Sequence, residues 1–391
     1  MRVIVIGAGI GGLTAALTLR RAGLDTVIYE QARELREVGA GIQLSPNATR
    51  VLLRLGLDDA LRRDGVRPIA GQFRRWDDGR VLSRAPLGDE CERIFGAPYY
   101  HFHRADLLTA LASAVPQEIV HLGHQCVGLE SVSDSVAVRF YNGVTARGDV
   151  VIGADGIHSM IRREIVGDEA PLFSGSIAYR GLVPATRLAR HGLETNATGW
   201  LGPDRHFVHY FVSGRRYVNF VAIVPGGDWR IESWTAKGAV ADALEEFDGW
   251  HPQVRAIIAA ATATNRWALY DRDPLERWTA GRVALLGDAA HAMLPFMAQG
   301  AAQAIEDAAV IARCLARAQA GEISIEGALT RYQDKRLPRA TRVQNGSRAN
   351  GVRYHLRDGE EQRRRDAAFA TAVAGTSTLN AWLFGHDAEA D

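Results

Sequence analysis

Apolar positions between Met1 and Glu30 follow two patterns in turn. Val3 to Ile6 form a short apolar run typical of a buried strand, and Thr26 to Tyr29 form a second one. The residues between them begin with closely spaced glycines and continue with helical spacing of apolar side chains. This order predicts a strand–helix–strand unit at the start of the chain.

Later segments repeat the alternation of strand and helix as far as about residue 170. A loop and an amphipathic helix are expected over 39–57, a helix over 103–115, and strands at Val136–Tyr141 and Val150–Gly153. These patterns are typical of an α/β protein with a parallel sheet.

The pattern changes between residues 172 and 275, where apolar and polar side chains alternate. Residues 198–225 predict several β-strands, with a turn at Ser213-Gly214. A strand, a loop and a long helix return over 282–315, and this strand is expected to rejoin the first sheet. From about 322 the chain is expected to be helical and charge-rich, with Arg363 to Asp366 on a solvated helix face.

Three glycines after the first strand have the spacing of a dinucleotide-binding turn. Gly7 permits the tight turn, Gly9 lets the backbone approach a pyrophosphate, and Gly12 lets the helix pack closely on the strand. The helix N-terminus then offers N–H groups to phosphates. Glu30 ends the second strand, where a carboxylate binds ribose hydroxyls and repels a 2′-phosphate, which favours FAD or NAD over NADP. A glycine-rich turn in an unrelated α/β protein is the alternative.

Two further segments place polar groups at predicted strand ends. In VIGADGIHSMIRR (151–163) a strand delivers Asp155 and Gly156 to the edge where ligands gather in open α/β sheets. In GRVALLGDAAHAMLPFMAQGAA (281–302), Asp288 follows a strand and a helix begins near residue 300. A carboxylate there suits a polyhydroxyl chain, and the helix N-terminus stabilises negative charge.

Composition narrows the class of protein. The 391 residues carry a formal net charge of +1, which gives no footprint for binding nucleic acid. No apolar run approaches the roughly 20 residues needed to cross a bilayer. Three scattered cysteines predict neither zinc nor disulfides and suit a reducing compartment. We therefore expect a cytoplasmic protein without metal, membrane or nucleic-acid partners, and a homodimer as a candidate assembly.

These ordered segments resemble the single-component FAD-dependent aromatic hydroxylases, a family of flavoprotein monooxygenases. GAGIQLSPNA, HRADL, AYRGLVP and HAMLPFMAQGAAQAIEDAA carry the resemblance, which runs from residue 1 to about 345. Salicylate hydroxylase, 6-hydroxynicotinate 3-monooxygenase and 3-hydroxybenzoate 6-hydroxylase are the most similar types. The resemblance implies hydroxylation of a small phenolic, salicylate-like acid with NADH or NADPH and dioxygen, through a flavin hydroperoxide.

The resemblance also implies an aromatic hydroxylase fold: an α/β Rossmann-like FAD-binding domain, a mixed β-sheet substrate domain and C-terminal helices. The expected bounds are FAD-binding domain 1–171 and 276–345, substrate domain 172–275, and helical segment 346–391. The residues implied in FAD binding are Gly7, Gly9, Gly12, Glu30, Gly41, Ile42, Arg104, Cys126, Asp155, Gly156, Asp288, Gly300, Ala301 and Ala302. Asp155 and Gly156 are also expected to help seat NAD(P)H.

Candidate catalytic residues lie on the strand HFVHYFV. His206, Val208 and Tyr210 share one face by two-residue alternation, so an imidazole that titrates near pH 6.5 and a phenol lie together. A packed core or surface histidine is the alternative from the residues alone. The resemblance assigns His206 and Tyr210 to catalysis, together with Pro295, whose carbonyl lies over the reacting ring in relatives.

Further residues bear on the substrate. Arg180 is a candidate carboxylate partner, or a brace for the sheet. Gln43 and Phe296 stand where the 6-hydroxynicotinate enzyme has histidines, and Pro295 stands where 3-hydroxybenzoate 6-hydroxylase has glutamine, so these departures favour an apolar, benzenoid pocket. A hydroxylase of an N-heteroaromatic such as 6-hydroxynicotinate stays open, with a flavin-dependent halogenase and a non-catalytic flavin-binding regulator as weaker alternatives.

Overall fold

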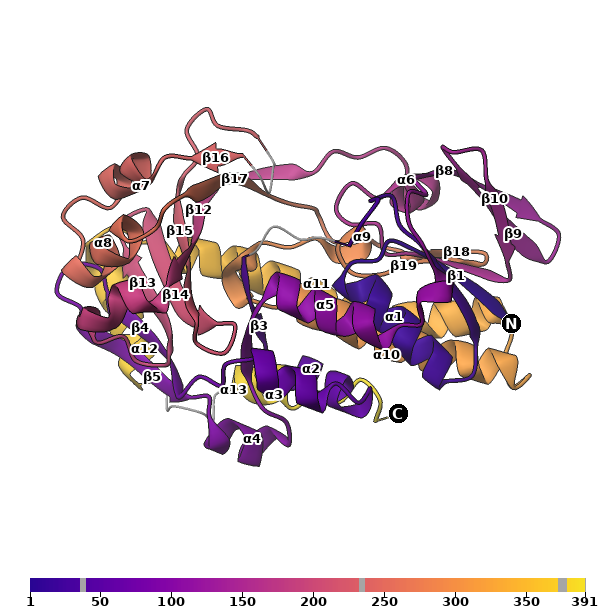
Figure 1. Ribbon diagram of the computed structural model, residues 1–391, viewed down its shortest axis with the longest axis horizontal. Helices are drawn as coiled ribbons and strands as arrows, with labels where there is room; N and C mark the ends of the chain where they lie inside the picture. Colours follow the sequence, from indigo (N-terminus) through magenta and orange to yellow (C-terminus); the bar gives the residue numbers. More distant parts are fainter. Residues whose placement is uncertain (36–39, 232–235, 372–377, 391) are drawn as a thin grey trace.

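The computed structural model describes residues 1–35, 40–231, 236–371 and 378–390. Gly39, which opens the segment 39–57, lies outside the described residues. A six-stranded sheet and an eight-stranded sheet lie at opposite ends of the molecule, with long helices running between them (Figure 1). The two sheets correspond to the two patterns expected from the sequence.

The six-stranded sheet has the order β18-β19-β11-β1-β2-β7. Parallel pairing runs from β19 through β11 and β1 to β2 and β7. The expectation that the strand after residue 282 rejoins this sheet is confirmed, because β19 pairs with β11. The strands are β1 (Arg2–Ile6), β2 (Asp25–Tyr29), β7 (Val120–His121), β11 (Val150–Gly153), β18 (Thr279–Ala280) and β19 (Val283–Leu285).

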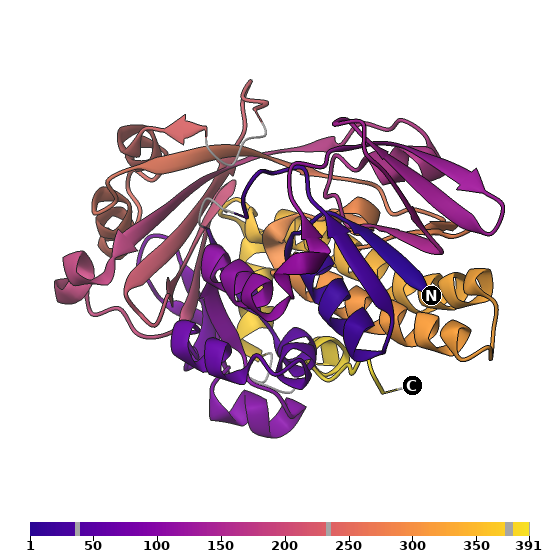
Figure 2. The ribbon, with the colours of Figure 1, turned by 45° about the vertical axis from the view of Figure 1, so that its right-hand side comes forward.

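Helices from distant parts of the chain cover this sheet, because its apolar strands are buried on both faces. Helix α1 packs against α10 and α5, and Figure 2 shows α1 and α10 side by side beneath the strands. The helices are α1 (Ile10–Arg21), α5 (Arg104–Ala114), α6 (Met160–Val166), α9 (Asp288–His291) and α10 (Gly300–Gln319).

The eight-stranded sheet has the order β16-β17-β12-β15-β14-β13-β4-β5. Its centre is the antiparallel series β12, β15, β14 and β13, and the expected turn at Ser213-Gly214 joins β14 to β15. The strands are β4 (Ala70–Arg75), β5 (Val81–Pro86), β12 (Leu172–Pro184), β13 (Ala197–Gly202), β14 (Arg205–Val212), β15 (Tyr217–Pro225), β16 (Lys237–Gly238) and β17 (Thr264–Asp271).

The eight-stranded sheet also contains strands from before the expected boundary at residue 171. Strands β4 and β5 come well before that boundary in the chain, yet β4 pairs in parallel with β13 and extends the substrate-side sheet. The exposed edge of β13 supplies the unpaired backbone groups that β4 satisfies. A chain excursion within 1–171 therefore belongs to the second sheet.

Smaller elements complete the fold. Helices α7 and α8 cover the outer face of the eight-stranded sheet with apolar side chains. The segment expected as a loop before residue 46 contains a short strand, β3, paired with β6. These elements are β3 (Gly41–Leu44), α2 (Pro46–Arg54), α3 (Asp58–Asp64), α4 (Asp89–Phe95), β6 (Tyr100–His103), η1 (Gln117–Ile119), β8 (Cys126–Val132), β9 (Ser135–Phe140), β10 (Thr145–Gly148), η2 (Ala185–His191), α7 (Val240–Glu246), α8 (Pro252–Ala259) and η3 (Pro295–Met297).

The C-terminal helices link the two sheets. Helix α11 (Ile325–Tyr354) runs from contacts with β18 at one end to Tyr354, which packs on Phe73 of β4 at the other. Helices α12 (Glu360–Thr371) and α13 (Thr378–Phe384) follow. The expectation of a solvated face at 363–366 is half wrong: Arg363 and Arg364 are exposed, but Arg365 and Asp366 are buried and bonded to each other. Pairing lets these opposite charges share a buried site.

Candidate active site

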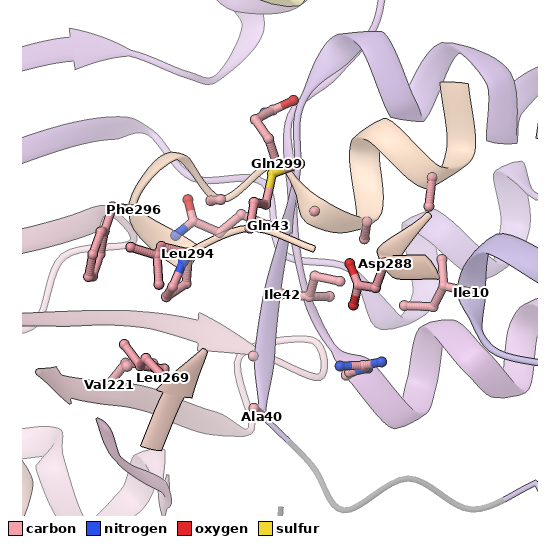
Figure 3. Close-up of a pocket in the computed structure, with 18 of the residues that line it drawn as sticks. Ile10, Ala40, Ile42, Gln43, Val221, Leu269, Asp288, Leu294, Phe296 and Gln299 are labelled. Carbon is pink, nitrogen blue, oxygen red and sulfur yellow. The ribbon is translucent and has the colours of Figure 1, made fainter. Parts of the chain in front are cut away.

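A cavity of about 350 Å³ lies between the two sheets. One end is formed by the first glycine turn and the start of α10, and the other by the face of the eight-stranded sheet. Figure 3 shows Ile10 and Asp288 at one side and Phe296, Val221 and Leu269 at the other. The cavity therefore brings together segments that lie far apart in the sequence.

The glycine turn has the close contacts that its sequence predicts. Gly7 has a φ of +104°, and a Cβ there would lie 2.4 Å from the carbonyl oxygen of Ala154. A Cβ on Gly12 would lie 1.9 Å from the oxygen of Gly7. Gly9 differs, because a Cβ there meets no atom within 4 Å and the residue lines the cavity. The backbone of the glycine turn is thus tightly packed where it faces the protein and unobstructed where it faces the cavity.

Glu30 lies beside this turn at the end of β2. Its carboxylate accepts hydrogen bonds from the Ala8 N–H at 2.8 Å and the Ala32 N–H at 2.7 Å. These bonds fix the carboxylate at the edge where the ribose of a dinucleotide would lie. The pyrophosphate would then face the open N-terminus of α1, whose cap residue Gly9 offers no side chain.

Asp288 and the start of α10 form the other part of this cofactor side. Asp288 follows Gly287, which has a φ of +64°, and its exposed side chain faces the cavity. Gly300 and Ala301 line the cavity at the N-terminus of α10, while Ala302 is buried behind them. A free helix N-terminus here favours an anionic group such as the pyrimidine edge of a reduced flavin.

Three of the residues implied in FAD binding differ in their position relative to the cavity: Asp155, Gly156 and Cys126. Gly156 lines the cavity, but the Asp155 carboxylate accepts bonds from Ser159 Oγ at 2.5 Å and the Met160 N–H at 2.8 Å, so it caps α6. Burial raises the pKa of this carboxyl group. Cys126 is half-buried at the start of β8, outside the cavity lining. Of the three, Gly156 alone lines the cavity.

Arg104, Gly41 and Ile42 line the middle of the cavity. The Gly41 N–H donates to Asn219 Oδ1 at 2.7 Å, and a Cβ on Gly41 would lie 2.6 Å from both Asn219 and Tyr210. Strand β3 therefore lies directly against the eight-stranded sheet. This contact places the segment expected to meet the flavin beside the expected substrate residues.

The substrate side is one face of the eight-stranded sheet. His206, Val208 and Tyr210 line the cavity from β14, as their alternation predicts. Across the sheet, His206 pairs with Ile223 of β15. Val208 pairs with Val221 of β15, and Val221 pairs in turn with Arg180 of β12. The backbone positions of His206 and Arg180 therefore lie two strands apart, about 10 Å across the sheet, and two residues apart along it.

Arg180 is the one arginine on this sheet face of the cavity, within the part of the chain that the structure describes. Its guanidinium lies over the ring of Trp267, 4.3 Å from the centroid. Burial lowers the pKa of Arg180 to about 10, with Tyr210 acting to raise it and Arg104 to lower it, so the side chain stays charged at neutral pH. The expected carboxylate partner thus lies on the cavity wall.

His206 is buried, and its Nδ1 lies 2.7 Å from Nε2 of His355, the C-cap residue that follows α11. Burial lowers the pKa of His206 well below its usual value, and His355 lowers it further. Phe296 and Tyr354 contact the imidazole edge-on. His206 is therefore a neutral imidazole held between aromatic rings.

The remaining candidates also line the cavity. Tyr99 donates to Gln43 Oε1 at 2.7 Å, and burial raises the pKa of Tyr210, so its hydroxyl stays protonated. Pro295 and Phe296 line the cavity from η3. Each residue predicted for catalysis or substrate binding lines this one cavity: His206, Tyr210, Pro295, Gln43, Arg180 and Phe296.

Sequence reasoning missed several residues of the site. Leu269 lines the cavity because it shares the sheet face with Arg180, and strand alternation within 264–271 carries that signal. Asn219 and His355 had no local signal, because each acts on a partner far away in sequence. His291 lies outside the cavity and bonds to Asp307 at 2.6 Å.

Comparison with known proteins agrees with this geometry. The family model described as FAD binding domain matches residues 1–347. The chain belongs to this family. It is an FAD-dependent aromatic monooxygenase of the salicylate hydroxylase type, as the sequence patterns led us to expect. The glycine turn, Asp288 and the N-terminus of α10 fit the cofactor, because they present open backbone and one carboxylate to the cavity.

Curated relatives align with this chain over most of its length. The 3-amino-4-hydroxybenzoate 2-monooxygenase of Streptomyces platensis is 43% identical over 99% of this chain and 96% of its own. The 6-hydroxynicotinate 3-monooxygenase of Pseudomonas fluorescens is 39% identical over 89% and 91%. Among solved structures, Klebsiella pneumoniae HpxO complexed with FAD and uric acid has a TM-score of 0.85 and 30% identity, covering 95% of this chain and 92% of its own.

Two findings concern other classes of site. Within residues 1–35, 40–231, 236–371 and 378–390, no helix combines the length and apolar character needed to cross a membrane. The same residues contain no group of three or more His, Cys, Asp or Glu side chains placed to hold a metal ion.

Proposed function

We propose that this monooxygenase hydroxylates a small phenolic carboxylic acid with NADH or NADPH as the electron donor and dioxygen as the oxygen source. The observation that carries the proposal is the placement of His206, Tyr210 and Arg180 on one face of the sheet, inside the cavity. A charged guanidinium there attracts a carboxylate, and a neutral imidazole accepts the proton of a ring hydroxyl. The bound FAD supplies the oxygen-transfer chemistry, while these residues orient the ring and exclude water.

The spacing of these side chains favours one arrangement of substituents. Arg180 and His206 lie two strands apart, so one ligand engages both when its carboxylate and hydroxyl lie on opposite sides of the ring. The substrate named for the Streptomyces relatives, 3-amino-4-hydroxybenzoate, has that arrangement. In salicylate the two groups are adjacent. We therefore propose a 4-hydroxybenzoate-type substrate in preference to the salicylate-like acid expected from the sequence.

A ligand panel tests this proposal. NAD(P)H oxidation is measured with 3-amino-4-hydroxybenzoate, 4-hydroxybenzoate, salicylate and 6-hydroxynicotinate, and each product is identified by mass. We expect the 4-hydroxy acids to accelerate oxidation and to gain one oxygen atom. Faster turnover of salicylate or 6-hydroxynicotinate would contradict the proposed substrate, and hydrogen peroxide as the sole product with every ligand would contradict the hydroxylase function.

A further inference from the structure

Two cavities meet at the histidine pair. His206 lines the enclosed cavity, and His355 lines a surface groove on the other side of Phe296. Leu294 and Phe296 contribute to both, so the wall between them is one layer of side chains thick. A hydrogen bond of 2.7 Å joins the two imidazoles across this wall.

We propose that His355 and His206 form a proton relay that carries the ring-hydroxyl proton of the substrate from the enclosed cavity to the surface groove. This inference rests on the proposed function, because it assumes a phenolic ligand against His206. His355 acts only through His206, so it is a positioning residue for proton transfer. One of its ring nitrogens can accept a proton from His206 while the other releases a proton to water.

The transfer balances without a charged intermediate. The substrate O–H bond breaks as an N–H bond forms at His206 Nε2. The proton on His206 Nδ1 passes to His355 Nε2, and the proton on His355 Nδ1 leaves to water. A phenolate remains in the cavity, one proton is in solvent, and both rings are neutral in the other tautomer. The reverse sequence resets the pair when the product takes up a proton.

The environment of the two rings explains why a relay is needed. Burial holds the pKa of His206 well below its usual value and lowers that of His355 to about 4. An imidazolium in either position is therefore unstable near neutral pH, and a proton accepted by His206 must be passed on. The cavity already holds the cations Arg104 and Arg180, and a further positive charge there is unfavourable.

The surface groove provides the path by which a proton from His355 reaches water. His355 is half-buried, and its backbone oxygen accepts a bond from the Asp204 N–H at 3.1 Å. Charged side chains surround this opening, and Asp204 acts to raise the pKa of His355. They are Asp204, Arg357, Glu360, Glu361, Arg348 and Asp271. Protons released from His355 thus reach a hydrated, mixed-charge surface.

The test measures proton loss without turnover. The FAD-loaded protein is mixed with 4-hydroxy-3-nitrobenzoate in the absence of NAD(P)H, at a pH below the pKa of the nitrophenol so that the free probe is protonated, and stopped-flow absorbance records phenolate formation. The variants are H355A, which opens space for a small base, and H355F, which fills it. H191A removes a histidine from the exposed end of η2 and is the matched control.

We expect phenolate formation to slow about 100-fold in both His355 variants, with the dissociation constant of the probe unchanged. Imidazole in the buffer should restore the rate in H355A and not in H355F, a rescue that a purely structural role would not give. A wild-type rate in H355A, or no rescue, overturns the relay and leaves the proposed function standing. A wild-type protein that binds the probe without ionising it overturns the base role of His206 and the relay with it.

Discussion

Arg180 is the residue on which the proposed choice of an acidic ligand depends. Its guanidinium lies on the cavity wall over Trp267, where the low local dielectric strengthens attraction to an anion. The imidazole of His206 and the hydroxyl of Tyr210 are neutral in the same cavity. Of these three side chains, Arg180 alone carries a charge that an acidic ligand would meet.

Replacing Arg180 with Met should weaken binding of carboxylate substrates. A charge-assisted hydrogen bond contributes about 1.5–3 kcal/mol, so we expect KM to rise roughly 10- to 100-fold with a smaller change in kcat. The carboxamide analogue of the same substrate is the matched control and should bind R180M as it binds the wild type. Equal losses for acid and amide would show that Arg180 serves only to support the sheet.

Two glycines of the first turn should respond differently to alanine. In G12A the new Cβ meets the Gly7 oxygen at 1.9 Å, so we expect loss of both folding stability and FAD binding. In G9A the Cβ enters open space, so the apoprotein should melt like the wild type while FAD affinity falls. Thermal unfolding of the apoprotein and flavin fluorescence titration separate the two effects. Wild-type FAD affinity in G9A would place the pyrophosphate elsewhere.

Helix α10 carries charged residues on its buried face. Glu306 and Asp307 are fully buried, and Arg336 of α11 donates to both, at 2.5 Å and 2.7 Å. Arg339 adds a bond to Glu306 at 2.6 Å, and Asn47 adds one from α2. This network fixes the direction of the helix whose N-terminus opens on the cavity.

Removing one partner should be costly here. R336M leaves buried carboxylates without their main cation, and we expect the free energy of unfolding to fall by about 3–5 kcal/mol. R331M, on the exposed side of the same helix, is the control and should change stability by less than about 0.5 kcal/mol. Denaturant unfolding measures both. Similar midpoints for the two variants would contradict a stabilising role for the network.

The same network predicts acid sensitivity. Burial alone would raise the pKa of Glu306, but Arg336 and Arg339 outweigh it and hold that pKa at about 2, below the usual 4.5. A folded-state pKa below the unfolded one gives stability that is present above pH 4.5 and lost as pH falls toward 2. We expect this group to contribute a slope of at most about 1.4 kcal/mol per pH unit in that window. Unfolding of R339M measured from pH 6 to 3 should show a shallower slope.

The sequence predicted strands and helices well where hydrophobic periodicity and glycines among adjacent residues determine them. The first strand–helix–strand unit and β14 follow from a few adjacent residues, and so does the row of His206, Val208 and Tyr210. It predicted less where distant segments meet. The joining of β4 to β13, the α10–α11 network and the pairing of His206 with His355 each depend on contacts between segments far apart in the chain. Local pattern does not encode such partners.

At the scale of the whole molecule, the cavity joins two sheets that share few direct contacts. Strand β3 contacts the substrate-side sheet through Gly41 and Asn219, and α11 spans both units. FAD held in this cavity would contact both sides. The bound cofactor would therefore form part of the structural link between the two sheets.

Removal of FAD should increase local unfolding on both sides of the cavity. We expect hydrogen–deuterium exchange of the apoprotein to increase at Gly41–Leu44 and at the first turn of α10, while α8 exchanges as in the holoprotein. The melting temperature should rise with FAD concentration, since a ligand that binds only the native state stabilises it. Increased exchange confined to one of the two segments would contradict a cofactor held from both sides.

The position of β19 has a consequence for synthesis of the protein. This strand completes the parallel series beside β11 only after the whole segment from β12 to β17 has been made. While the ribosome is still translating the second sheet, the edge of β11 lacks its neighbour, and Asp288 and the start of α10, which line the cofactor side of the cavity, have not yet been made. We therefore expect FAD to bind only after this strand has been made, and the open edge of β11 to be a site for non-native pairing until then.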